Sequence, residues 1–272
     1  MNKLLFIWVI MISFQGFSQK TISKITWKKV DDGLHLGAYT SPKKSEIGDN
    51  IVTVLKIDPS KYNFNLLSAK KKGEKIKTAK QWVVENKQIA VINAGMYQAD
   101  FKTNLGFMKD YSFTNNGRLN KDNTIIAFNR KVDSIPEIQI IDRTCQDWEV
   151  LKEQYSSFSQ SIRMIDCKQK NKWGQQSKKW SMVVIGIDKE GNALFIFTRS
   201  PYSVHDFINI LLTPELNIYN IMYLEGGPEA SFYLNHNGTE VAKVGSYETG
   251  FYENNGNNRF WPIPNVIGIS KK

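Results

Sequence analysis

Short apolar or alternating runs dominate the chain, and turn residues end most of them. Such runs are typical of β-strands with one or both faces buried. The strands that they predict lie at 51–57, 62–67, 89–92, 125–128, 138–141, 180–187, 193–198, 219–224 and 231–234. The turn Asp-Lys-Glu-Gly-Asn joins two of them, 180–187 and 193–198, and therefore predicts a hairpin.

Helical signals are few. Thr78 is a suitable N-cap for a short helix that ends at Glu85. The segment Ser203-Val204-His205-Asp206 fits a capping box, with Asp206 at the third helical position, and predicts a helix through Leu212. Strands outnumber helices by too much for a regular alternation of the two. We therefore expect an α+β fold: a single domain with a mixed or antiparallel twisted sheet and a few packed helices.

The first 18 residues have the three-part pattern of a secretory signal peptide. Lys3 precedes an apolar run at 4–12, and a polar stretch with small residues follows up to Ser18. The run is shorter than the roughly 20 apolar residues that span a bilayer. A buried N-terminal helix is the alternative. We expect residues 1–18 to be removed and residues 19–272 to form an exported domain, periplasmic or secreted, with no membrane span.

Composition and charge narrow the function classes. The chain is 41% hydrophobic and 12% aromatic, which is typical of a folded protein with a large core. Its net charge of +10 favours anionic partners. The densest basic run comprises Lys70, Lys71, Lys72, Lys75, Lys77 and Lys80. A solvated loop and helix face is the favoured interpretation of this run, and no nucleic-acid-binding module accompanies it.

Cysteines and histidines provide few catalytic signals. Cys145 and Cys167 can form a disulfide in an exported protein, but sequence leaves their geometry open. A nucleophilic thiol is disfavoured, because neither a Gly-rich elbow nor a paired histidine is present. The three histidines, at 35, 205 and 236, lack the spacing of metal ligands. No metal or cofactor is expected.

Candidate chemistry gathers where polar residues follow predicted strands, since such groups are held rigidly beside loops. These places are 93–97, 159–163, 198–200 and the turn 224–229. Each also has a purely structural interpretation. Asn93 and Gly95 suit a turn, Arg163 and Arg199 suit surface ion pairs, Asp206 suits a helix cap, and Glu225 suits a solvated turn.

Together these segments resemble the phosphodiester glycosidase family over roughly residues 50–270. The matching motifs are Ile92-Asn93-Ala94-Gly95-Met96-Tyr97, Gln160-Ser161-Ile162-Arg163, Phe197-Thr198-Arg199, Tyr223-Leu224-Glu225-Gly226-Gly227-Pro228-Glu229-Ala230 and the closing segment 264–269. The fourth motif departs from the family pattern Asn-Leu-Asp-Gly-Gly-Gly-Ser-Ser. Glu225 stands for Asp, Pro228 for Gly, and Glu229 with Ala230 for the two serines. These departures indicate a divergent branch.

The resemblance implies a hydrolase that cleaves a sugar from a sugar-1-phosphodiester, whose leaving group is a phosphate monoester. Arg163 and Arg199 would hold the phosphate through bidentate hydrogen bonds. Backbone N–H groups of Gly226 and Gly227 would add to this cradle.

The sugar side requires a carboxylate that attacks the anomeric carbon or activates a water. Glu225 is the first choice, with Glu229 and Asp206 in reserve. Asn93, with Gly95 beside it, would bind a sugar hydroxyl or the phosphate, and Tyr97 would stack on the ring. A non-catalytic binding module for phosphorylated glycans is the alternative. A nucleic-acid binder or nuclease is a third and weaker interpretation.

Overall fold

The computed structural model describes residues 24–272. The expected signal peptide, residues 1–18, lies outside the described part of the chain. Within residues 24–272, no helix is long and apolar enough to cross a membrane.

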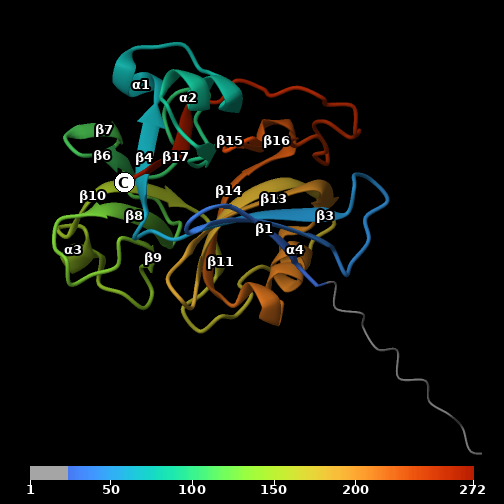
Figure 1. Ribbon diagram of the computed structural model, residues 1–272, viewed down its shortest axis with the longest axis horizontal. Helices are drawn as coiled ribbons and strands as arrows, with labels where there is room; N and C mark the ends of the chain where they lie inside the picture. Colours follow the sequence, from blue (N-terminus) through green and yellow to red (C-terminus); the bar gives the residue numbers. More distant parts are fainter. Residues whose placement is uncertain (1–23) are drawn as a thin grey trace, which may run out of the picture.

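Three antiparallel sheets make up the fold (Figure 1). In spatial order, the seven-stranded sheet contains β1 (Thr26–Asp31), β2 (Leu34–Thr40), β3 (Ile51–Ile57), β13 (Ala193–Tyr202), β12 (Trp180–Asp188), β14 (Ile218–Gly226) and β11 (Arg163–Ile165). One five-stranded sheet contains β7 (Phe113–Asn116), β6 (Met108–Asp110), β10 (Tyr155–Ser161), β8 (Thr124–Arg130) and β9 (Ile138–Asp142). The other contains β16 (Thr239–Val244), β15 (Ser231–His236), β5 (Ala90–Asn93), β17 (Asn265–Lys271) and β4 (Tyr62–Ser68).

Helices are short and lie on the outside of the sheets. They are α1 (Ala69–Lys72), α2 (Ala79–Glu85), α3 (Trp148–Leu151) and α4 (Val204–Leu211), with the 3-10 turns η1 (Pro214–Leu216) and η2 (Gly227–Glu229). Thr78 and Gln81 form a capping box that begins α2. Ser203 caps α4 by accepting a hydrogen bond from the backbone N–H of Asp206. Both predicted helix starts are therefore confirmed.

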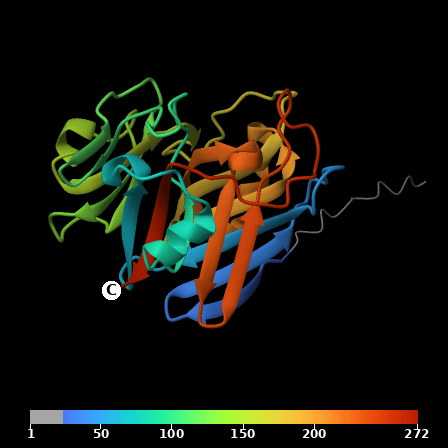
Figure 2. The ribbon, with the colours of Figure 1, turned by 90° about the horizontal axis from the view of Figure 1, so that it is seen from above.

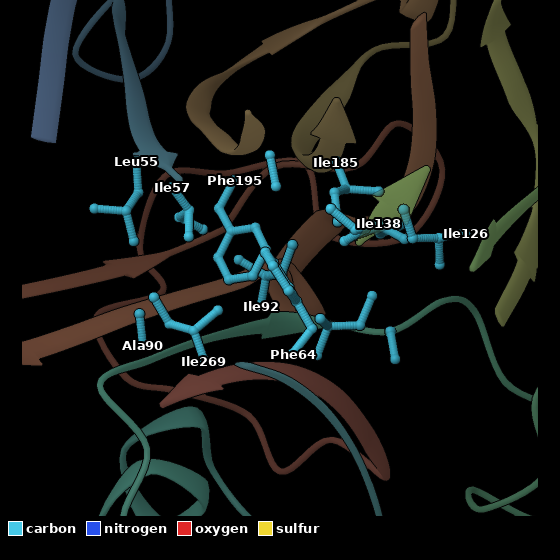
Figure 3. Close-up of a cluster of buried hydrophobic side chains, with 14 of the residues drawn as sticks. Leu55, Ile57, Phe64, Ala90, Ile92, Ile126, Ile138, Ile185, Phe195 and Ile269 are labelled. Carbon is cyan, nitrogen blue, oxygen red and sulfur yellow. The ribbon is translucent and has the colours of Figure 1, made fainter. Parts of the chain in front are cut away.

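One hydrophobic core lies where the three sheets meet (Figure 3). Phe195 of β13 packs there against Phe64 of β4, with their ring centroids 6.4 Å apart. The next residues along β13, Leu194 and Ile196, belong to a second cluster beneath α4. Because both faces of β12 and β13 are buried, these strands read as continuous apolar runs.

Within residues 24–272 the architecture is mainly β, with far more residues in strands than in helices. Of the predicted α+β fold with one mixed or antiparallel sheet and a few packed helices, the structure bears out the antiparallel pairing and the few helices, but the strands form three sheets and the fold is mainly β. β3 has the predicted bounds, and the predicted hairpin is β12 with β13. The expected strand end at Thr198 is wrong, because β13 continues to Tyr202 and places Arg199 inside the strand.

A long connection between β16 and β17 completes the molecule. It covers residues 245–264 and contains no regular strand or helix. Figure 2 shows it in red, passing over the ends of the strands near η2. Several of its backbone groups are hydrogen-bonded to neighbouring elements, including the N–H of Gly245, which donates to the Ala230 carbonyl at 2.8 Å.

Candidate active site

The Gly-Gly turn follows a bulge in β14. Val183 of β12 lies opposite Glu225, whereas the next residue, Val184, lies opposite Tyr223. Leu224 is therefore an extra residue in the ladder. A bulge bends its strand and redirects the side chains that follow, which is why bulges are common beside active sites. Here it brings Glu225 to the start of the turn that leads into η2.

Both glycines of the turn are required by close packing. A Cβ on Gly226 would overlap the Tyr223 hydroxyl. Gly227 has a φ of 61°, and a Cβ there would overlap a carboxylate oxygen of Glu248. The Gly226 N–H already donates to Glu225 Oε1 at 3.0 Å. These contacts do not support the predicted phosphate cradle, because the turn already faces carboxylates.

Three carboxylates gather at this turn: Glu225, Glu229 and Glu248. Burial raises the pKa of Glu225 to about 8; Glu229 and Glu248 add to the shift, and the N–H of Gly226 opposes it. Burial also raises the pKa of Glu229 to about 7, with a further contribution from Glu248. The pKa of Glu248 itself is raised by burial, against the attraction of Lys178. Such a cluster exchanges protons near neutral pH, which is typical of acid–base sites.

Asn93 holds the turn in place. Its side chain is 1% exposed, so it is not available to a ligand from solvent. Its Nδ2 donates to the Glu229 carbonyl at 3.1 Å, and its Oδ1 accepts from the Ser231 N–H at 2.8 Å. Asn93 therefore positions Glu229, whereas the sequence predicts direct contact with substrate.

An aromatic pocket opens beside Glu229 and has a volume of about 680 Å³. Besides Glu229, its wall comprises Ile76, Tyr97, Phe101, Phe251, Arg259, Phe260, Trp261 and Pro262. Burial raises the pKa of the Tyr97 hydroxyl far above its usual value, and Glu225 and Glu229 add to the shift. The structure thus brings together Tyr97, Glu225 and Glu229, three of the predicted site residues.

Arg163 has other partners. Its NH1 donates to both carboxylate oxygens of Asp142 at 2.9 Å and to the Thr144 hydroxyl at 2.7 Å. Asp142 is 1% exposed, so loss of Arg163 would leave a buried carboxylate without its cation. These contacts favour the structural ion pair over the phosphate role.

Arg199 fastens the 245–264 connection to β13. Its guanidinium donates four hydrogen bonds of 2.8 Å, to Asn255 Oδ1 and to the carbonyls of Val244, Asn255 and Asn257. All three nitrogens of the group are used. Arg199 therefore positions the loop that carries Glu248, and it does not line the aromatic pocket.

Comparison with known proteins identifies the family. The family model described as phosphodiester glycosidase matches residues 86–270, a range that contains the Asn93 motif and most of the closing strand. This chain belongs to the phosphodiester glycosidase family. The resemblance that the motifs predict is therefore confirmed.

Solved structures share the fold of this phosphodiester glycosidase family member at low sequence identity. A hypothetical protein from Synechocystis is 13% identical, with a TM-score of 0.65 over 93% of this chain, which spans 64% of that protein. The zebrafish N-acetylglucosamine-1-phosphodiester alpha-N-acetylglucosaminidase catalytic domain, auto-inhibited by its pro-peptide, is also 13% identical. Its TM-score is 0.55, over 92% of this chain and 83% of that domain. No curated protein matches in sequence.

Two other predicted site residues of this family member lie outside the carboxylate cluster. Asp206 forms an ion pair of 2.7 Å with Lys43 at the start of α4. Burial alone would raise its pKa, but the hydrogen bonds from Lys43, Ser203 and Gln175 bring that pKa below its usual value. Gly95 has a φ of 140°, which suits glycine at a turn. Asp206 is therefore placed as an ion-pair partner in the first turn of α4, which Ser203 caps, and Gly95 as a turn residue.

Glu248 and Arg259 are absent from the sequence prediction, although both lie at the site. Each is a single charged residue in a long irregular loop, with no neighbouring motif. Glu248 lies 23 positions beyond Glu225 along the chain and reaches it only through the path of the loop. No local pattern separates either residue from the many other charged residues of the surface.

Cys145 and Cys167 form a disulfide, so neither thiol is free. Within the described residues, the only group of three possible metal ligands is Asp142 with these two cysteines, and their sulfurs are bonded to each other. Three of the six lysines in the basic run form ion pairs: Lys71 pairs with Asp110, and Lys77 pairs with Glu74 and Glu85. Lys80 pairs with Glu240. These pairs support the interpretation of the run as a solvated face.

Proposed function

We propose that this protein is an exported hydrolase that cleaves a sugar from a sugar-1-phosphodiester in an envelope or extracellular glycan. The observation that carries the proposal is the carboxylate pair Glu225 and Glu229, whose pKa values are raised to about 8 and about 7. Glu229 also lines the aromatic pocket. Membership of the phosphodiester glycosidase family supplies the reaction class.

The chemistry requires one ionised carboxylate near the anomeric carbon. Glu229 has the lower pKa of the pair and lines the pocket, so it is our candidate for attack on that carbon or for activation of a water. The bond between the anomeric carbon and the phosphate oxygen breaks, and the electron pair leaves with the phosphate. Water supplies the hydroxyl of the released sugar and one proton.

Glu225, the first choice from sequence, becomes the protonated partner in this scheme. At neutral pH its carboxyl keeps its proton, which limits the repulsion that an ionised Glu229 experiences. The phosphate monoester is a weakly basic leaving group, so strong general-acid assistance is not required. Tyr97 is proposed to stack on the sugar ring, since an aromatic side chain offers an apolar face beside a polar hydroxyl.

Export is proposed on two grounds. The N-terminal residues have the pattern of a signal peptide. The disulfide between Cys145 and Cys167 is of the kind that persists in oxidising compartments. A phosphorylated glycan of the cell envelope is an accessible substrate there.

Neutral substitutions of the two carboxylates test the proposal. Glu229→Gln should lower kcat by at least about 100-fold, because it removes the ionised carboxylate that acts in proton or covalent chemistry. Glu225→Gln keeps a neutral side chain in place of the protonated carboxyl and should retain much more activity. Thermal unfolding should remain cooperative in both variants. Glu46→Gln, at an exposed position outside the pocket, is the control and should keep full activity. Full activity of Glu229→Gln would refute the assignment.

A panel of chromogenic sugar-1-phosphodiesters distinguishes the candidate functions. Release of sugar supports the hydrolase. Saturable binding of a phosphorylated glycan without release would instead identify a binding module. A salt-dependent shift with DNA, absent with glycans, would support a nucleic-acid binder and contradict both.

A further inference from the structure

The expected phosphate-binding groups are occupied elsewhere. Arg163 pairs with a buried aspartate, and Arg199 donates to the 245–264 connection. The Gly226 N–H donates to Glu225, and a carboxylate oxygen of Glu248 lies against Gly227. A phosphate at the turn would meet negative charge. If the enzyme binds a phosphodiester, its phosphate-binding group must lie in another part of the pocket.

Arg259 is the cationic side chain in the wall of the aromatic pocket. It is exposed, and its guanidinium has no ion pair or hydrogen bond with the other residues of the described range 24–272. Guanidinium binds phosphate through two parallel hydrogen bonds and keeps its charge at all accessible pH values. Arg259 therefore has both the location and the free donors that an anion requires.

The backbone around Arg259 is tied to the catalytic turn. Asn257, which is 4% exposed, donates to the Gly245 carbonyl at 2.7 Å and to the Pro228 carbonyl at 3.5 Å. Its Oδ1 accepts from the Arg259 N–H at 3.4 Å. One buried amide thus links the segment of Arg259 to the residue that precedes Glu229. This linkage fixes the position of the Arg259 backbone relative to Glu229.

Two exposed rings flank the same pocket. Phe101 is 58% exposed and Phe251 is 60% exposed, and they come from different loops. Phe101 has a φ of 57°, which is unfavourable for a bulky residue and is often retained at functional sites. Its ring lies 5.9 Å from that of Tyr97, and the Phe251 ring lies 6.2 Å from that of Trp261. Exposed aromatic groups beside a pocket indicate contact with a ligand that has an apolar face.

We infer that Arg259 binds the phosphate of the phosphodiester and that Phe101 and Phe251 contact the alcohol on its far side. This inference rests on the proposed function. It specifies the substrate class as a sugar-1-phosphodiester whose alcohol carries an apolar or ring-bearing group. Arg259 would then stabilise the charge that develops on the leaving phosphate.

The first test measures binding in the Glu229→Gln background, where substrate is not turned over. The probes are the methyl and phenyl diesters of N-acetylglucosamine 1-phosphate, with free N-acetylglucosamine for comparison, titrated by calorimetry. Adding Arg259→Gln should weaken binding of both diesters at least tenfold and leave binding of the free sugar unchanged. Arg259→Lys should retain part of the affinity. Arg118→Gln, at another exposed arginine outside the pocket, is the matched control and should have no effect.

The second test concerns the rings. Phe101→Ala and Phe251→Ala should each reduce the preference for the phenyl over the methyl diester. Tyr111→Ala is a matched control, because Tyr111 is 57% exposed with a φ of 53° and lies outside this pocket. An unchanged preference in both phenylalanine variants would refute their contact with the alcohol.

The outcomes separate this inference from the proposed function. Diester binding that does not depend on Arg259, or no diester binding at all, overturns the inference. An equal loss of free sugar and diester in Arg259→Gln also overturns it, because that pattern indicates a disturbed pocket. Arg259-dependent binding without hydrolysis by the unmodified protein would support the inference and refute the hydrolase.

Discussion

The three carboxyl groups at the Gly-Gly turn lose their protons one after another, because each negative charge makes ionisation of the next carboxyl group less favourable. Burial is the largest cause of the raised pKa of Glu225, and Glu229 and Glu248 add to it. Glu248 is the neighbouring carboxylate that raises the pKa of Glu229. The proton balance of the proposed reaction therefore depends on Glu248, a residue that needs no contact with the substrate.

Substitution of Glu248 should change the pH profile of the reaction. The pKa of Glu229 is about 7, so at pH 6 only about one tenth of this group is ionised. Glu248→Gln removes a negative neighbour, lowers the pKa of Glu229 and moves the acid limb of kcat/KM to lower pH. At pH 6 the variant should retain a larger fraction of its own maximal activity than the unmodified enzyme.

Glu253→Gln is the matched control, since Glu253 is exposed and belongs to the same loop. Its acid limb should stay in place. If the acid limb of Glu248→Gln also stays in place, Glu229 is not the group that must be ionised. The readout is the position of the limb, which a general loss of activity would not move.

At the scale of elements, the site combines residues from regular secondary structure with residues from an irregular loop. β14 and η2 supply Glu225 and Glu229, whereas the 245–264 connection supplies Glu248, Phe251 and Arg259. Loops of this length without secondary structure are uncommon in compact domains and are usually functional. The loop is held by hydrogen bonds to buried neighbours. The Ser246 N–H, for example, donates to the Ser181 hydroxyl at 3.0 Å.

Arg199→Met should loosen this loop. The change removes four hydrogen bonds from a charged donor. Each such bond typically contributes about 1.5–3 kcal/mol to stability. Hydrogen–deuterium exchange should accelerate in residues 244–257, and activity should fall more than tenfold. Arg130→Met is the matched control, because Arg130 holds the 133–137 turn through the carbonyls of Asp133 and Ile135. It should accelerate exchange there and leave activity intact. Unchanged protection of residues 244–257 in Arg199→Met would contradict the anchoring role.

At the scale of the whole molecule, the three sheets share one hydrophobic core, and a disulfide cross-links two of them. Cys145 follows β9 in a five-stranded sheet, and Cys167 follows β11 in the seven-stranded sheet. The ion pair between Arg163 and Asp142 crosses the same junction. The disulfide and this pair therefore stabilise the packing of two sheets that exchange no ladder hydrogen bonds.

Replacing both cysteines with serine should lower the free energy of unfolding by about 3 kcal/mol, the value expected for a closed loop of roughly this length. The sequence separation is 22 residues. Urea denaturation measures the change, and addition of reductant to the unmodified protein should reproduce it. Activity under native conditions should persist, because neither cysteine lines the aromatic pocket. An unchanged unfolding midpoint in the double variant would contradict this role.

Much of the fold was accessible from sequence, because alternation and turn residues are local signals. The β12–β13 hairpin, the α2 capping box and the strand that ends in Asn93 are set by neighbouring residues. The short strands β6, β7 and β11 were missed, since three or four residues carry too little periodicity. The longer strands β1, β2, β10 and β16 were missed as well, because they contain many polar residues and lack a clear apolar run. The family was also recognisable, because its motifs keep their order along the chain.

The sequence by itself determined the strands, the family and the Gly-Gly turn with Glu225 and Glu229. The tertiary structure alone decided which charged groups share the site. It committed Arg163 and Arg199 to other partners, and it brought Glu248 to the Gly-Gly turn and Arg259 to the aromatic pocket. The physical reason is that a carboxylate's neighbours in space determine its pKa, and an arginine's acceptors determine its role. Those neighbours come from distant segments, joined by a loop whose path no local pattern encodes.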